Sequence, residues 1–159
     1  MNREEYRLLT LQLQAVMEGS EVPLSQLANA SALLWMTLPD LNWAGFYLMT
    51  EKGELVLGPF QGKPACTRIQ MGKGVCGTAA LTRITQRVPD VHLFPGHIAC
   101  DSASRSELVV PLIRRNQLIG VMDLDSPLPD RFSAEDQEGL EGFAAALMET
   151  DAWDHGLMG

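Results

Sequence analysis

The chain has 159 residues, of which 46% are hydrophobic, and a formal net charge of −8. This length and apolar content suit one domain with a sizeable core, which we expect to span residues 1–159. The acidic balance argues against nucleic acid or an anionic membrane as a partner, because both bind basic surfaces.

The first residues, 1–5, are too polar for a signal peptide, and no later apolar run reaches the ~18 residues of a membrane span. We therefore expect a cytoplasmic protein, in which thiols stay reduced. Two helices are predicted within about residues 3–38. The first, over 4–18, carries an apolar stripe formed by Leu9, Leu13, Val16 and Met17. The second, over about 24–36, has a core face formed by Leu27, Ala30 and Leu34.

Sheet and loop patterns then extend over about residues 42–125. An aromatic and apolar strand, 42–49, and a return strand, 55–60, flank a hairpin turn at 51–53. A short edge strand is expected at 68–70. The sequence therefore predicts that the sheet begins with a hairpin and an added edge strand.

Gly72, Lys73 and Gly74 open a short helix of small residues. They are a weak phosphate-loop candidate, because they lack the Walker spacing, and we favour a structural turn. A short extended piece at 87–91 and two strands, 107–113 and 118–124, complete the sheet.

The last helix covers about 133–150, with Ser133 as N-cap and Asp136 at the third position. The tail after it has little to anchor it. Helices thus flank five or six strands joined mostly by hairpins, which predicts an α+β fold: an antiparallel sheet with helices packed on one side.

Three cysteines, Cys66, Cys76 and Cys100, lie in polar segments rich in small residues. An odd count does not suit a closed disulfide framework, and the polar setting favours reactive thiols over buried inert ones. Cys100 lies in a loop between a turn at 94–96 and the apolar run 108–113, so we predict that it is a nucleophile.

Two chemistries compete for these cysteines. Zinc is one alternative, with His92 and His97 as further ligands, but the spacings are irregular and no C-x2-C pair is present. We otherwise expect both histidines to be polar loop residues. The other chemistry is attack of a thiolate on an oxidised sulfur, with a second cysteine resolving the product.

Alternation places Asp123 and Asp125 on one face of a strand. A three-residue hairpin loop at 114–116 would put Glu107 directly opposite Asp123, whereas a two-residue loop would pair it with Leu124. We favour the three-residue loop, because an asparagine at 116 tolerates the left-handed conformation that it needs.

Crowded carboxyls repel, so at least one should keep its proton near neutral pH and serve as a general acid, while an ionised neighbour holds an ammonium group. A solvated surface hairpin is the alternative. The acids also disfavour a Cys100 thiolate, which Arg105 or a cationic substrate would have to offset.

Trp43 and Tyr47 are four residues apart on one strand and share a face, with Gly45 leaving space between them. They are either plain core aromatics or an apolar wall for a small ligand.

Five motifs together resemble the free methionine-(R)-sulfoxide reductases, an enzyme branch of the GAF-domain superfamily. They are NWAGFY (42–47), LGPFQGK (57–63), GVCGTA (74–79), GHIACD (96–101) and GVMDLDS (120–126). The resemblance implies a six-stranded antiparallel sheet with helices on one face and a ligand pocket on the other.

The resemblance also implies reduction of free L-methionine-(R)-sulfoxide with thioredoxin as reductant and without a cofactor or metal, and a homodimer as a further possibility. By position, Cys100 matches the catalytic cysteine, and Cys66 and Cys76 match the two that form disulfides after turnover. Which of the two resolves first stays open. Pocket residues are matched by Trp43, Tyr47, Glu107, Asp123 and Asp125. A non-catalytic GAF-type sensor is the main competing hypothesis.

Overall fold

A computed structural model describes residues 1–97 and 102–159. Within them, an antiparallel sheet of six strands has the order β3-β2-β1-β6-β5-β4. The strands are β1 (Trp43–Met49), β2 (Glu54–Gly62), β3 (Arg68–Gln70), β4 (Gln86–Val88), β5 (Ser106–Arg114) and β6 (Gln117–Ser126). The expected α+β fold with an antiparallel six-stranded sheet is confirmed.

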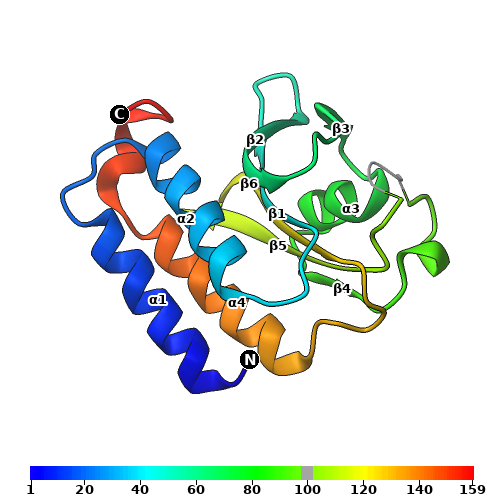
Figure 1. Ribbon diagram of the computed structural model, residues 1–159. Helices are drawn as coiled ribbons and strands as arrows, with labels where there is room; N and C mark the ends of the chain where they lie inside the picture. Colours follow the sequence, from blue (N-terminus) through cyan, green and yellow to red (C-terminus); the bar gives the residue numbers. More distant parts are fainter. Residues whose placement is uncertain (98–101) are drawn as a thin grey trace.

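Three long helices lie on one side of the sheet (Figure 1): α2 (Pro23–Thr37) and α4 (Ala134–Met148) pack on its strands, and α1 (Arg3–Met17) packs on α4 and α2. The short helix α3 (Gly74–Thr82) packs on the opposite face. The prediction of helices on one face therefore holds for the three long helices and not for α3. Two 3-10 turns, Val91–Leu93 and Asp151–His155, complete the described elements. None of these described helices is long and apolar enough to cross a membrane.

Alternation along the central strands sorts their side chains between two apolar clusters. Phe46 and Met122 join the cluster beneath the three long helices. Tyr47 and Val121, one residue further along or back, join the cluster beneath α3. Because successive side chains of a strand point to opposite faces, every residue on the α3 side alternates with a residue buried against the long helices. The functional face of the sheet is thereby coupled to a close-packed core.

Both ends of the chain differ in detail from the sequence expectation. Val16 is exposed rather than part of the α1 stripe, and Tyr6 is buried in that stripe instead. The C-terminal tail is anchored, contrary to expectation: Arg114 forms an ion pair with Asp154 at 2.7 Å, and the Trp153 indole N–H donates to Leu147 O. A charge pair and a packed indole give the tail the contacts that its composition did not suggest.

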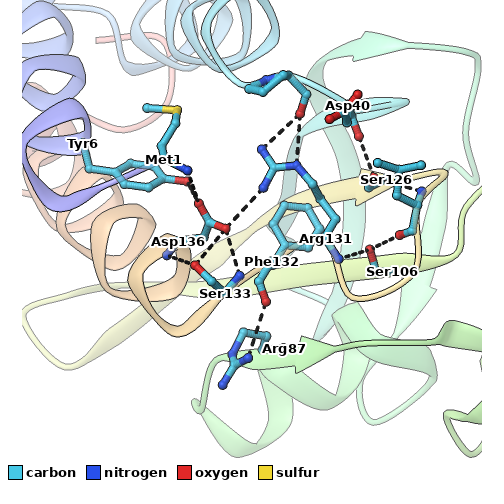
Figure 2. Close-up of polar contacts among 12 residues, drawn as sticks. Met1, Tyr6, Asp40, Arg87, Ser106, Ser126, Arg131, Phe132, Ser133 and Asp136 are labelled. Carbon is cyan, nitrogen blue, oxygen red and sulfur yellow. Dashed lines mark hydrogen bonds and ion pairs between the residues drawn. The ribbon is translucent and has the colours of Figure 1, made fainter.

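The predicted cap of α4 is confirmed. Ser133 Oγ accepts the Asp136 N–H, and an Asp136 carboxylate oxygen accepts the Ser133 N–H in return. Asp136 also accepts the Tyr6 hydroxyl at 2.6 Å and pairs with Arg131 at 3.2 Å (Figure 2). Because these contacts favour its ionised form, they lower the pKa of Asp136 despite its burial. One carboxylate therefore joins α1, α4 and the segment before α4.

The β5–β6 hairpin differs from the predicted one. Arg114 pairs with Gln117, so the loop has two residues, Arg115 and Asn116, with φ angles of 48° and 66°. Two consecutive left-handed residues are the geometry of a tight hairpin turn whose twist matches the strands. The expected three-residue loop and its pairing of Glu107 with Asp123 are therefore wrong.

An irregularity between Leu112 and Ile113 shifts the register by one residue. As a result, Glu107 lies opposite Asp125, whereas the same loop without the shift would place Glu107 opposite Leu124. The three acidic side chains consequently still share one face. The bulge thus restores what a plain two-residue hairpin would have broken.

Gly45 of β1 allows a close approach of β2. A Cβ atom at this position would overlap the Cα and Cβ atoms of Phe60. The expectation that Gly45 leaves open space beside Trp43 and Tyr47 is wrong, because Phe60 fills that space and stacks on Trp43 with ring centroids 5.2 Å apart. Gly45 therefore allows β1 and β2 to pack closely, and it lets the Phe60 ring lie beside Trp43.

We predict that Gly45→Ala destabilises the protein by about 2 kcal/mol, because the added methyl overpacks the β1–β2 contact. Gly142→Ala, on α4, is the matched control. A Cβ there meets nothing within 4 Å, so the free energy of unfolding should rise by about 0.5–1 kcal/mol. Urea unfolding of both variants checks this, and equal effects of the two substitutions would contradict it.

Candidate active site

A cavity opens between the sheet and α3, on the face opposite the long helices. Its empty space, mouth included, is about 570 Å³. The lining residues are Trp43, Tyr47, Pro64, Ala65, Ile69, Lys73, Gly74, Val75, Cys76, His97, Ser104, Glu107, Asp123 and Asp125. Six of the eight site residues expected from the sequence are thus brought together around one cavity.

Three carboxyl groups form the floor of this cavity. Glu107 projects from β5, and Asp123 and Asp125 from β6, and all three line the cavity. Glu107 and Asp123 are only 7% and 5% exposed. The Oδ1 atom of Asp123 is buried and has no hydrogen-bond partner within the described residues. The cluster is therefore not a solvated hairpin face, and it leaves an acceptor open toward the cavity.

Burial controls the charge of this floor. It raises the pKa of Glu107 well above the usual value, and the nearby carboxyls of Asp123 and Asp125 raise it further. Burial also raises the pKa of Asp123, while hydrogen bonds from Glu107 and Cys76 partly offset the rise. Since two buried carboxyls in contact disfavour double ionisation, Glu107 keeps a proton that Asp123 helps to hold. The floor therefore holds a carboxyl that favours its protonated form, Glu107, in contact with a second buried carboxyl, Asp123.

Cys76 lies in the first turn of α3 and points at the same acids. Its Sγ donates to Glu107 Oε2 over 3.9 Å. Burial, and next the charges of Asp123 and Glu107, raise the pKa of this thiol well above its usual value. Cys76 is therefore held in its protonated, weakly nucleophilic form.

The aromatic pair forms one wall of the cavity. Trp43 and Tyr47 stack with ring centroids 5.8 Å apart, and Phe60 continues the stack beyond Trp43. The Tyr47 hydroxyl donates to Cys66 O at 2.9 Å, and the Trp43 indole N–H donates to Lys63 O at 3.2 Å. These side chains are thus both buried core residues and cavity lining, so the two sequence alternatives are compatible.

Cys66 and Cys76 differ in redox state. Cys66 is half-buried in the segment between β2 and β3, and its sulfur is in a disulfide. Cys76 is a free thiol. Cys100 lies outside the described residues, so its role as nucleophile stays a prediction. Arg105, which we considered as a cation near it, pairs with Asp90, with Nη2 and Oδ2 3.6 Å apart.

The start of α3 borders the cavity. The Gly72–Gly74 turn, considered structural, leads into α3, with Lys73 as its N-cap beside the cavity. The first bond across this turn is from Gly77 N–H to Lys73 O at 3.0 Å, so the N–H groups before Gly77 have no partner within the helix. In the sequence, a glycine-flanked lysine before a helix of small residues was the pattern that could have indicated this helix start as part of the cavity.

A polar network holds the acid-bearing end of the hairpin from behind (Figure 2). The Arg131 guanidinium donates twice to Pro39 O, at 3.1 and 3.0 Å, and pairs with Asp136. Ser126 Oγ donates to Asp40 O at 2.6 Å. The loop before β1 and the segment before α4 are thereby fastened to the end of β6.

Ser106 and Ser126 are paired across the hairpin, immediately next to Glu107 and Asp125. Ser106 Oγ donates to Leu128 O at 2.6 Å. Ser106 and Ser126 are completely buried. Because neighbouring residues on a strand face opposite ways, these hydroxyls fix the backbone from which the two carboxyls project into the cavity.

Among the described residues, one group has side-chain atoms close enough together to hold a cation, and it lies on the floor formed by the carboxyl groups, here called the acid floor. The sulfur of Cys76 and one carboxylate oxygen each from Glu107 and Asp123 lie within 4.8 Å of one another. Neither His92 nor His97 belongs to this group. His97 lines the cavity, where burial and then the charge of His92 lower the pKa of its imidazole.

The comparisons with known proteins agree with this arrangement. The family model for the GAF domain matches residues 13–150. The chain is 55% identical to the free methionine-R-sulfoxide reductase of Escherichia coli over 148 residues, covering 92% of this chain and 89% of that protein. It is 47% identical to the yeast enzyme of the same name, from Saccharomyces cerevisiae, covering 92% of this chain and 86% of that protein.

A solved structure is similar over the same extent. The free methionine-R-sulfoxide reductase of Neisseria meningitidis, in complex with its substrate, superposes with a TM-score of 0.87 at 43% identity. The match covers 91% of this chain and 86% of that one. The fold and the cavity thus define a member of the GAF-domain family. Within that family, the chain belongs to the free methionine-R-sulfoxide reductases.

The acid floor predicts a pH dependence of stability. Because the folded-state pKa of Glu107 is raised above 4.5, the folded protein keeps a proton that the unfolded chain releases. Stability is therefore lost as pH rises from that value toward the folded-state pKa, by at most ~1.4 kcal/mol per pH unit for one proton. Urea unfolding at several pH values should show that Glu107→Gln removes this loss. The exposed Glu51→Gln is the control for removal of one charge, and parallel curves for Glu107→Gln and wild type would contradict the prediction.

Proposed function

We propose that the protein reduces free L-methionine-(R)-sulfoxide to L-methionine. One observation carries this proposal: acidic, cationic and aromatic surfaces line a single cavity. A free amino acid with an apolar side chain has three matching parts, namely an ammonium group, a carboxylate and a hydrocarbon chain. The named activity of relatives at 55% and 47% identity supports the same substrate.

The ammonium group would lie on the acid floor. Asp123 offers an unpartnered buried oxygen, and Asp125 lies beside it on the same strand face. A bound ammonium donates to such oxygens and adds a positive charge that the buried acids lack. The substrate itself thereby lowers the cost of burying a carboxylate in this cavity.

The carboxylate group would lie at the start of α3. The N–H groups of Gly74 and Val75 are in the unbonded first turn, and Lys73 adds a positive charge at the mouth of the cavity. Helix N-termini favour anions, because unpaired N–H groups and the helix dipole act together. The two charged ends of the amino acid would then span the cavity from floor to helix.

The sulfoxide group would lie between the aromatic wall and the nucleophile. The Cys100 thiolate attacks the sulfoxide sulfur and forms a sulfur–sulfur bond, while the protonated Glu107 donates a proton to the sulfoxide oxygen. The protonated oxygen then moves from the substrate sulfur to the Cys100 sulfur as the sulfur–sulfur bond breaks. Methionine leaves with its sulfur reduced, and Cys100 is oxidised to a sulfenic acid. A raised pKa at Glu107 supports it as the donor, because the carboxyl must still be protonated at neutral pH.

A second cysteine would then condense with the sulfenic acid to form a disulfide and release water. Cys66 is the better candidate for this step. It carries a disulfide in this structure while Cys76 is free, and the acids hold Cys76 in the thiol form. Cys76 would follow by exchange. Thioredoxin, as the external dithiol, would return the enzyme to its reduced form, and we propose that this takes place in the cytoplasm. The assembly that we propose is a homodimer.

Cysteine variants test the order of these steps. Cys100→Ser should release no methionine. Cys66→Ser should release about one equivalent per enzyme and then slow at least ~tenfold with thioredoxin, because its sulfenic acid is not resolved. Chromatography of methionine in single-turnover and steady-state assays gives both values. Undiminished turnover by Cys100→Ser would contradict the proposed nucleophile.

Blocked substrates test the amino-acid pocket. N-acetyl-methionine-(R)-sulfoxide should lose at least ~100-fold in kcat/KM, because acylation removes the ammonium charge and leaves buried acids unpaired. The free sulfoxide of the same stereochemistry is the control. Equal kcat/KM values for the two compounds would overturn the assignment of the acid floor to the ammonium group.

A further inference from the structure

The two aromatic residues of the cavity wall each make a second, polar contact. Both contacts reach the segment at 63–67, which lies between β2 and β3 outside regular secondary structure. The Tyr47 hydroxyl donates to the backbone carbonyl of Cys66 at 2.9 Å, and the Trp43 indole N–H donates to the carbonyl of Lys63 at 3.2 Å. The contact of Tyr47 is thus with the redox-active residue itself.

The two aromatic residues lie on a strand in the middle of the sheet, β1, whereas the segment at 63–67 that they contact is a loop. β1 is paired on both sides, with β2 and with β6, and Trp43 and Tyr47 are each 3% exposed. The segment is further joined to β2 by a bond from Leu57 N–H to Thr67 O at 3.0 Å. A short connection outside the sheet has more conformational freedom than a central strand, so each bond to β1 restricts where Cys66 can go.

We propose that Tyr47, beyond its place in the cavity wall, is a positioning residue for Cys66 in the disulfide-forming step. This inference rests on the proposed function. Its hydroxyl, with the Trp43 indole as a second anchor, holds the Cys66 backbone against the wall that contacts the substrate. Burial raises the pKa of the Tyr47 hydroxyl, so it remains a hydrogen-bond donor throughout the neutral range.

The step that this anchor would accelerate balances in atoms and electrons. The Cys66 thiol attacks the sulfenic acid sulfur, a sulfur–sulfur bond forms, the sulfur–oxygen bond breaks, and water leaves. The sulfenic sulfur is reduced and the Cys66 sulfur is oxidised. A thiol held near its target reacts faster than one on an unrestrained segment, because less conformational freedom is lost in the transition state.

The test compares two rates in Tyr47→Phe, which removes only the hydroxyl. Methionine release is measured by chromatography, and disulfide formation at Cys66 by mass spectrometry after alkylation of the remaining thiols. The ratio of disulfide formation to methionine release should fall about fivefold, the factor that one neutral hydrogen bond supports. Dimedone added during turnover should capture correspondingly more sulfenic acid.

Tyr6→Phe is the matched control. It removes another buried tyrosine hydroxyl, which donates to Asp136 at 2.6 Å on the opposite side of the sheet (Figure 2). It should lower stability and leave the rate ratio unchanged. Trp43→Phe, which removes the bond to Lys63, should lower the ratio in the same direction as Tyr47→Phe, and it serves if the tyrosine variant does not fold.

Hydrogen peroxide provides a second oxidant that is independent of the sulfoxide. It converts a thiol to a sulfenic acid with release of water, so disulfide formation can be timed even in a protein that does not reduce methionine sulfoxide. If the proposed function is wrong, the wild type does not release methionine. If this inference is wrong, the variants form the disulfide at Cys66 as the wild type does. An unchanged ratio in Tyr47→Phe, or an equal fall in Tyr6→Phe, overturns the positioning role.

Discussion

The burial of two carboxyl groups, those of Glu107 and Asp123, beside the half-buried Asp125 on the β5–β6 hairpin is the constraint on which the site depends. In water these groups would all ionise near neutral pH, but beneath α3 they cannot, so Glu107 keeps a proton and Asp123 presents an unpartnered oxygen. The same field keeps Cys76 protonated. The burial of these acids therefore supports the roles proposed for Glu107 as proton donor and for Asp123 as ammonium site, and it disfavours any buried thiolate until a cationic ligand binds.

The sheet isolates this polar floor from the core. Leu108 and Leu124 alternate with the acids along the hairpin and pack under the long helices, while the acids face the cavity. The Arg131 network and the two buried serines fasten the same end of the hairpin from behind (Figure 2). The electrostatic cost of burying the acids is thus opposed by close packing on the opposite face, and the bonds from Tyr47 and Trp43 join the segment of Cys66 to the same sheet.

Much of the architecture could be predicted from the sequence, because local patterns encode it. The cap at Ser133, the edge strand at 68–70 and the acids alternating along β6 follow from short-range spacing. The register of the β5–β6 hairpin could not be predicted in this way, since it depends on a bulge between Leu112 and Ile113 that has no sequence signature of its own. The three acids share a face because two deviations from the expected hairpin, a shorter loop and a one-residue shift, add up to a change of two residues in register, which leaves every side chain on the expected face.

The sequence by itself determined which side chains share a face of each strand and which residue types are available for thiol chemistry, because period and composition are local properties. The tertiary structure decided what those residues do. It placed Phe60 where Gly45 seemed to leave room, turned α3 so that its first turn and Lys73 border the cavity, and tied Tyr47 to Cys66. Such contacts join elements distant in the chain, and burial, which sets the protonation of Glu107, exists only once they are assembled.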